Sequence, residues 1–275
     1  AMLAPLVVHS QLVRQEVPIM IGASVLMLVL VLDGRLGRTD GGLLLALLIG
    51  YTVYLIRQSR AESMEVRDEY EANVGRGGGW DKHWAVQLLL IVAGLGLLVL
   101  GSEWLVDSAV AFARALGVSD LVIGLTIIAA GTSMPEVATS VLAVLRGERD
   151  IAVGNVIGSN TFNLMGALGL SGLVSTQGLT IAPAIMNFDV WVMLAVALAC
   201  LPVFVAGREI GRGKGLLFLG YYVAYIAYLV LDAQGHDALP AYSRIMIGFV
   251  LPITIVTLVA MLLKDQAKSA AGGPD

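Results

Sequence analysis

Hydrophobic residues along this chain gather into blocks of about twenty, separated by shorter polar stretches. A block of roughly that length, wound as an α-helix, crosses a hydrocarbon core of about 30 Å. One longer hydrophilic stretch, 58–83, interrupts the series and is expected to be a linker. The pattern predicts an all-α, polytopic membrane protein with eight crossings, at 17–33, 39–57, 84–105, 119–145, 151–173, 187–206, 214–232 and 244–263.

Composition excludes several classes of protein. Hydrophobic residues make up 57% of the chain and charged residues 14%, which does not fit a soluble domain with a polar surface. The single cysteine, Cys200, cannot form a disulfide framework, and the three histidines are scattered. No nucleophile and base pair lies at helix depth, so we expect no enzyme activity. We also expect no cofactor and no nucleic-acid partner.

The placement of lysine and arginine predicts an orientation. If each crossing changes sides, the side on which the chain begins collects thirteen of these residues and the other side four, Arg35, Arg38, Arg114 and Arg244. Because basic residues concentrate in cytoplasmic loops, the richer side is expected to face the cytoplasm. Both termini and the 58–83 linker of this inner-membrane, multi-pass protein would then be cytoplasmic.

The chain contains a repeat. The stretch 37–41, which leads to Tyr51 and Tyr54, is echoed by 211–215, which leads to Tyr225 and Tyr228, at an offset of 174. With small gaps, helices 17–33 and 39–57 thus match 187–206 and 214–232. Five crossings separate the starts of the two copies, so the copies enter the membrane from opposite sides. This inverted arrangement is common in secondary transporters, whose substrate sites lie between the repeats.

The first copy is incomplete. Two unusual helices, 119–145 and 151–173, precede the second copy, whereas the first begins close to Ala1. The repeat therefore predicts a matching helix pair before residue 1. Two explanations stay open: the chain is a truncated piece of a longer protein, or another chain supplies the missing half.

Helix 119–145 carries the first candidate chemistry. Its apolar run is interrupted by the sequence GTSMPE at 131–136. Pro135 lacks an N–H and is expected to displace the carbonyl of Gly131, which would leave backbone oxygens unpaired. A carboxylate such as Glu136 costs about 2.5–3.5 kcal/mol at this depth on insertion scales. Both costs at one place indicate a bound cation.

Helix 151–173 supplies the opposing wall. Asn155, Ser159 and Asn163 are spaced by four, so their side chains lie along one face, and Gly154 and Gly158 allow a neighbour to approach closely. Carboxylate, carbonyl, hydroxyl and amide oxygens are the ligands of hard cations such as Ca²⁺ and Na⁺. These motifs contain no cysteine and no histidine, which argues against copper or zinc.

The two motifs, GTSMPE at 131–136 and GNVIGSNTFN at 154–163, resemble the α-repeat signature of the calcium/cation antiporter superfamily, which includes the sodium/calcium exchangers and their bacterial relatives. The chain resembles a ten-helix exchanger of the bacterial type without its first α-repeat and with an added C-terminal helix. The resemblance implies these domains: 1–57, the remainder of the first repeat; 58–83, the linker; 84–232, the second repeat; and 233–275, the added helix and tail.

The resemblance also implies ion ligands, on the carbonyl of Ala129 and on the side chains of Thr132, Ser133, Glu136, Ser159 and Asn163. Exchangers of this family often carry Asp where this chain has Asn163, so the chain has one carboxylate fewer.

The leading hypothesis is secondary active antiport of a divalent cation, calcium, against Na⁺ or H⁺. The expected partners are these inorganic cations and membrane lipid. One alternative is a half-assembly component or inactive fragment that needs another chain to supply the missing repeat. Another is a passive cation channel, which would conduct without a counter-ion.

Overall fold

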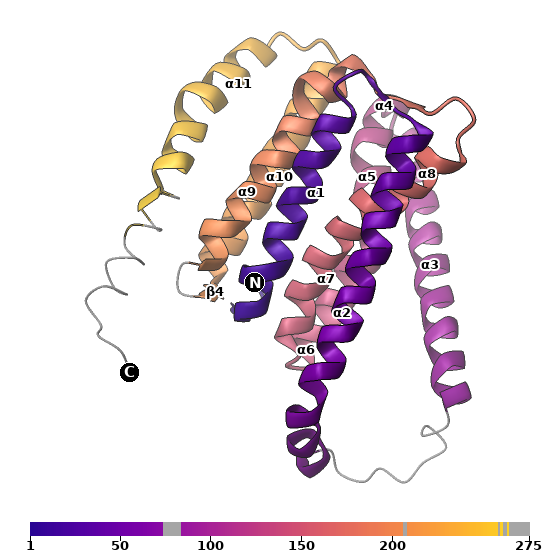
Figure 1. The fold of residues 1–275 in the computed structure, drawn as a ribbon. Coiled ribbons are helices and arrows are strands. Elements are labelled where there is room, and N and C mark those ends of the chain that lie inside the picture. Colours follow the sequence, from indigo (N-terminus) through magenta and orange to yellow (C-terminus); the bar gives the residue numbers. More distant parts are fainter. Residues whose placement is uncertain (74–83, 206–207, 258, 261–262, 264–275) are drawn as a thin grey trace.

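Helices make up almost all of the regular structure, as expected for an all-α membrane protein (Figure 1). The computed structural model describes residues 1–73, 84–205, 208–257, 259–260 and 263. Within these residues, six helical segments are long and apolar enough to cross a membrane: Leu12–Leu30, Arg38–Ser59, Trp84–Ala115, Ile185–Val205, Arg212–Ala233 and Leu239–Thr257.

The helices and their π-turns, labelled η, follow one another along the chain with four two-residue strands between them. In order they are β1 (Leu6–Val7), η1 (Leu12–Glu16), α1 (Val17–Leu30), β2 (Arg35–Leu36), α2 (Arg38–Asn73), α3 (Trp84–Ala115), α4 (Asp120–Ile123), η3 (Gly124–Ile128), α5 (Ala129–Gly131), α6 (Met134–Leu145), α7 (Arg149–Phe162), η4 (Asn163–Ala167), α8 (Leu168–Val174), β3 (Leu179–Thr180), η5 (Ile185–Asp189), α9 (Val190–Val205), β4 (Glu209–Ile210), α10 (Arg212–Ala233), α11 (Leu239–Ile245) and η7 (Met246–Val250).

Two expected segments differ from the structure. The prediction of one continuous helix over 119–145 is wrong, because the helix ends at Gly131 and restarts at Met134. The expected linker is helical at its start, since α2 continues to Asn73, and residues 74–83 lie outside the described residues. Strong helix formers such as Ala, Glu, Met and Arg fill 58–73, so the helix continues after the hydrophobic run ends.

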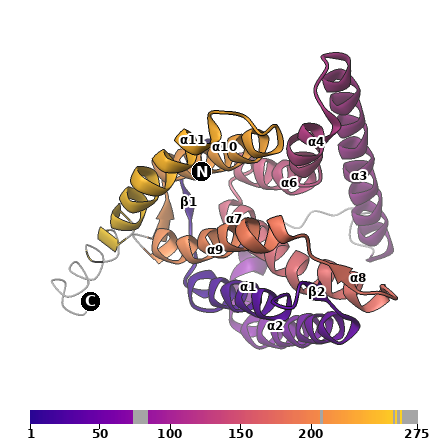
Figure 2. The same cartoon turned by 90° about the horizontal axis from the view of Figure 1, so that it is seen from above.

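Helix α7 lies in the interior of the bundle, between α6 and α10 on one side and α1 and α9 on the other (Figure 2). Its buried residues Val153 and Ile157 belong to one core cluster with Val17 and Met20 of α1 and Ala197 of α9. Positions 153 and 157 lie on the opposite face from Asn155 and Ser159, given 3.6 residues per turn. Burial of the apolar face therefore fixes the direction in which the polar face points.

The segment before α1 is attached to the start of α7. The guanidinium of Arg149 donates to the carbonyl of Pro5 at 3.3 Å, and His9 Nε2 lies 3.2 Å from a carboxylate oxygen of Asp150. The start of α7 is thus attached to the segment before α1 by one bond to a backbone carbonyl and one contact between side chains.

The repeat found in the sequence recurs in the structure. Strand β2 and helix α2 begin at Arg35 and Arg38, and β4 and α10 begin 174 positions later, at Glu209 and Arg212. The strands pair antiparallel and across the copies, β1 with β4 and β2 with β3. Because the strands flank α1 and α9, this crosswise pairing makes the two helices antiparallel, as an inverted repeat requires.

Helices α2 and α8 approach closely through glycine. A Cβ atom on Gly41 would lie 2.6 Å from the carbonyl oxygen of Gly169 and 2.8 Å from the carbonyl carbon of Gly172. These are backbone atoms of a buried contact, and they cannot rotate away. The close approach holds α8, at the end of the predicted helix 151–173, against α2 of the first copy of the repeat.

Gly41→Ala is therefore expected to destabilise the protein by about 1–3 kcal/mol, the usual effect of overpacking a close contact. Gly50→Ala is the matched control on the same helix, because nothing lies within 4 Å of its Cβ position. That control should be neutral or should stabilise by up to about 1 kcal/mol through helix propensity. Thermal unfolding in detergent measures both, and equal melting temperatures would contradict the close approach.

Candidate functional site

The GTSMPE motif forms a break between two helices. Helix α5 ends at Gly131, and α6 begins at Met134 with Pro135 in its first turn. At this position the missing N–H of proline does no harm, because the first turn of a helix has free N–H groups in any case. Helix α3 packs against the break, since any side chain on Gly131 would collide with Val106.

The break brings four of the predicted ligands together, Ala129, Thr132, Ser133 and Glu136. The hydroxyl of Thr132 donates to the carbonyl of Ala129 at 3.1 Å. Ser133 forms the N-terminal boundary of α6, and Glu136 lies in its first turn. The C-terminal end of α5 presents carbonyls and the N-terminal end of α6 carries a partial positive charge, so this arrangement suits a cation beside a carboxylate.

Glu136 carries an unsatisfied polar atom. Its carboxylate oxygen Oε2 is buried and has no hydrogen-bond partner among the described residues. A buried carboxylate oxygen without a partner is costly, and metal coordination is one of the few ways to stabilise it. This oxygen is the observation that most directly indicates a ligand.

The antiparallel hairpin of α6 and α7 determines which residues of α6 lie opposite the remaining predicted ligands, Ser159 and Asn163. The amide of Asn155 on α7 donates to the backbone carbonyl of Glu136 at 3.1 Å. Because α6 and α7 run antiparallel, Ser159, one turn further along α7, is carried toward the level of Ser133. Asn163, another turn along, is carried toward the end of α5. The motifs are thus arranged face to face in matching order.

The ligand side chains differ in exposure. Glu136 and Ser159 are half-buried, whereas Thr132, Ser133 and Asn163 are exposed. The hydroxyl of Ser159 donates within its own helix, to the carbonyl of Val156 at 3.1 Å. Thr132, Ser133 and Asn163 thus reach the surface of the part of the chain that the structure describes.

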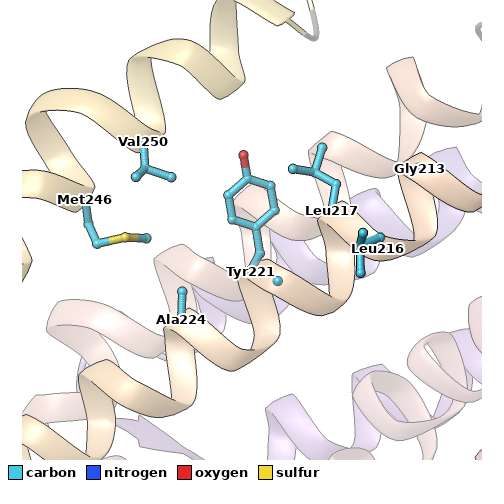
Figure 3. Close-up of a pocket in the computed structure, with 8 residues that line it drawn as sticks. Gly213, Leu216, Leu217, Tyr221, Ala224, Met246 and Val250 are labelled. Carbon is cyan, nitrogen blue, oxygen red and sulfur yellow. The ribbon is translucent and has the colours of Figure 1, made fainter.

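Two grooves elsewhere in the described residues are apolar. One of about 470 Å³ runs between α10 and η7 and is lined mainly by Leu216, Leu217, Tyr221, Met246 and Val250 (Figure 3). A second of about 460 Å³ lies between α1 and α2. Neither groove includes a motif residue, which is consistent with lipid-facing surfaces of membrane helices.

Two polar contacts were missed by the sequence reasoning. Asn155 was expected only to share a face with Ser159 and Asn163, but its amide is bonded to α6. The sequence patterns did not single out Asp189, which accepts a hydrogen bond from Tyr225 at 2.8 Å. The repeat does not indicate the second contact, because Gln15 in the first copy donates to Tyr54 at 3.5 Å, whereas Tyr225 corresponds to Tyr51.

Known proteins resemble this chain along most of its length. A family model described as sodium/calcium exchanger protein matches residues 86–231. Inner membrane protein YrbG of Escherichia coli is 36% identical over 83% of this chain and 70% of its own. Sodium/calcium exchanger MaX1 of Methanosarcina acetivorans is 38% identical over 53% of this chain and 41% of its own.

A solved structure of the sodium-calcium exchanger NCX_Mj superposes with a TM-score of 0.63 at 30% identity, covering 82% of this chain and 69% of the other. The matched family region contains both motifs and the hairpin that joins them. The described fold, the motif geometry and these similarities agree, and the chain belongs to the sodium/calcium exchanger protein family.

Proposed function

We propose that this chain acts in secondary active antiport, exchanging a divalent cation, calcium, for Na⁺ or H⁺ across the membrane. The observation that carries the proposal is the buried, unpartnered Oε2 of Glu136 at the break between α5 and α6. A cation supplies what this oxygen lacks, and a site inside the membrane serves ions that cross it.

The ligand set in the proposal is the carbonyl of Ala129 with the side chains of Thr132, Ser133, Glu136, Ser159 and Asn163. Every one of these groups offers oxygen, the donor that calcium and sodium prefer. Support comes from the hairpin, which connects the backbone of Glu136 to the helix that carries Ser159 and Asn163. Thr132 and Ala129 are in direct contact.

Exchange follows from competition for Glu136. An ionised carboxylate without a counter-charge is strongly disfavoured in a low-dielectric site, so the empty site resists changing sides. The site then has to reload with one cation or the other before it turns, which couples the two fluxes. In this proposal both termini and the 58–83 linker face the cytoplasm, as the distribution of lysine and arginine favours.

Glu136→Gln is expected to reduce calcium uptake, driven by a sodium or proton gradient, by more than about tenfold. The amide keeps the shape but removes the charge that attracts the cation, a loss above roughly 1.4 kcal/mol. Uptake of radiolabelled calcium into vesicles that contain the full-length protein measures the effect, with and without the opposing gradient.

The matched control is Glu148→Gln, the same change at the exposed turn between α6 and α7. Wild-type uptake by Glu136→Gln would refute the role given to this side chain. Calcium flux by the unmodified protein that is indifferent to sodium and protons on the opposite side would favour a channel instead.

Asn163→Asp is expected to change the affinity for calcium or the dependence on the counter-ion, because it adds a carboxylate to a ring of otherwise neutral oxygens around Glu136. A second negative charge favours a divalent cation over a monovalent one. Calcium uptake across a sodium titration and a pH titration tests this. An unchanged pair of titrations would count against Asn163 as a ligand.

A further inference from the structure

One amide bridges the two motif helices. Asn155 Nδ2 lies 3.1 Å from the backbone carbonyl oxygen of Glu136, 3.1 Å from the hydroxyl of Thr139 and 3.0 Å from the hydroxyl of Ser140. All three acceptors belong to the first two turns of α6, and Asn155 is half-buried against them. A single side chain of α7 therefore holds the start of α6.

The chemistry at this point requires a donor. A backbone carbonyl can only accept, so the atom of Asn155 that faces Glu136 has to be the amide nitrogen. The hydroxyl of Thr139 is already directed at the carbonyl of Pro135, at 2.9 Å, and turns its lone pairs outward. An aspartate at position 155 would have the same size and shape but would place an acceptor against the Glu136 carbonyl, which cannot donate.

The bridge reaches the first turn of α6, directly after the break. Glu136 is the third residue after the break at Thr132–Ser133, and the preceding Pro135 has no N–H with which to bond the previous turn. The groups left free at a helix start are N–H groups and not carbonyls, so the bond from Asn155 to the Glu136 carbonyl is an additional attachment of α6 to α7. Asn160, by contrast, donates to the carbonyl of Val156 in its own helix at 2.8 Å and makes no such bridge.

We infer that Asn155 is a positioning residue for the cation site, which holds the Glu136 peptide against α7 so that the ligands of α6 and α7 keep a fixed separation. Because its amide hydrogens are directed at α6, the role assigned to Asn155 is to join the two helices. The inference rests on the proposed function in that it assigns a role within the proposed cation site.

The test compares one substitution at three positions of the same helix: Asn155→Asp, Asn160→Asp and Asn163→Asp. The purified full-length protein is heated in detergent with increasing calcium chloride, and the rise in melting temperature reports binding. Asn155→Asp should need at least about tenfold more calcium for the same rise, since several hydrogen bonds that position Glu136 are lost. Asn160→Asp should behave as wild type, and Asn163→Asp should still respond to calcium, with an altered midpoint.

A second measurement needs no cation. Spin labels are attached at Val137 and Phe162, which are both exposed, after Cys200 has been replaced by serine. In calcium-free protein the distance distribution between the labels should broaden in Asn155→Asp and stay narrow in Asn160→Asp. If Asn155→Asp yields no monodisperse protein, Thr139→Val with Ser140→Ala removes two of the three acceptors and should give the same broadening and the same weaker calcium response.

The possible failures can be told apart. A lower melting temperature without calcium, combined with a wild-type calcium response, would mean that Asn155 only stabilises the fold, and the inference would be wrong. A narrow distance distribution in Asn155→Asp would overturn it as well. If even the unmodified protein responds to neither calcium nor sodium, the proposed function fails, and the distance distributions still decide whether Asn155 holds the two helices together.

Discussion

The arrangement of this chain depends on one constraint: a carboxylate has been placed inside a membrane helix, at Glu136, and has to be compensated there. In water a glutamate on a helix surface needs no partner, whereas in a hydrocarbon environment every polar atom has to find one within the protein or on an ion. The interrupted helix answers part of this requirement, because its free carbonyls and helix start lie beside the carboxylate. The Oε2 atom of Glu136 has no hydrogen-bond partner among the described residues, and in the proposed function a cation compensates it.

The rest of the bundle fixes the positions of the helices around Glu136. Val153 and Ile157 pack α7 into the core formed with α1 and α9, so α7 cannot rotate without exposing or clashing with apolar side chains. Strand pairing across the copies fixes the ends of α1 and α9 on both sides of the bundle. The glycine contact between α2 and α8 holds the far end of the same continuous helix. Helix α7 is thus held in a fixed position by its neighbours, and α6 is attached to it through Asn155.

Much of the fold could be predicted from the sequence, because its signals were local. Runs of about twenty apolar residues indicated the helices, and the parity of the crossings indicated an inverted repeat, which the pairing of β2 with β3 and β1 with β4 reproduces. The break at Thr132–Ser133 was missed because a proline is compatible both with a kink and with a new helix start. Tertiary packing against α3, at Gly131 and Val106, distinguishes the two, and no local pattern carries that information.

The sequence proposes the members of the candidate site, but it does not indicate the contacts between them. Spacing by four placed Asn155, Ser159 and Asn163 on one face, but equal spacing does not say that the first of them bonds to a neighbouring helix while the other two stay open. That division depends on the register of the α6–α7 hairpin, which the short turn at 146–148 sets and which brings Asn155 level with Glu136. A polar face inside a membrane bundle therefore has two tasks, joining helices and binding ions. The residue nearest the turn joins them because its partners are already within reach, which leaves the residues farther along free to meet a cation.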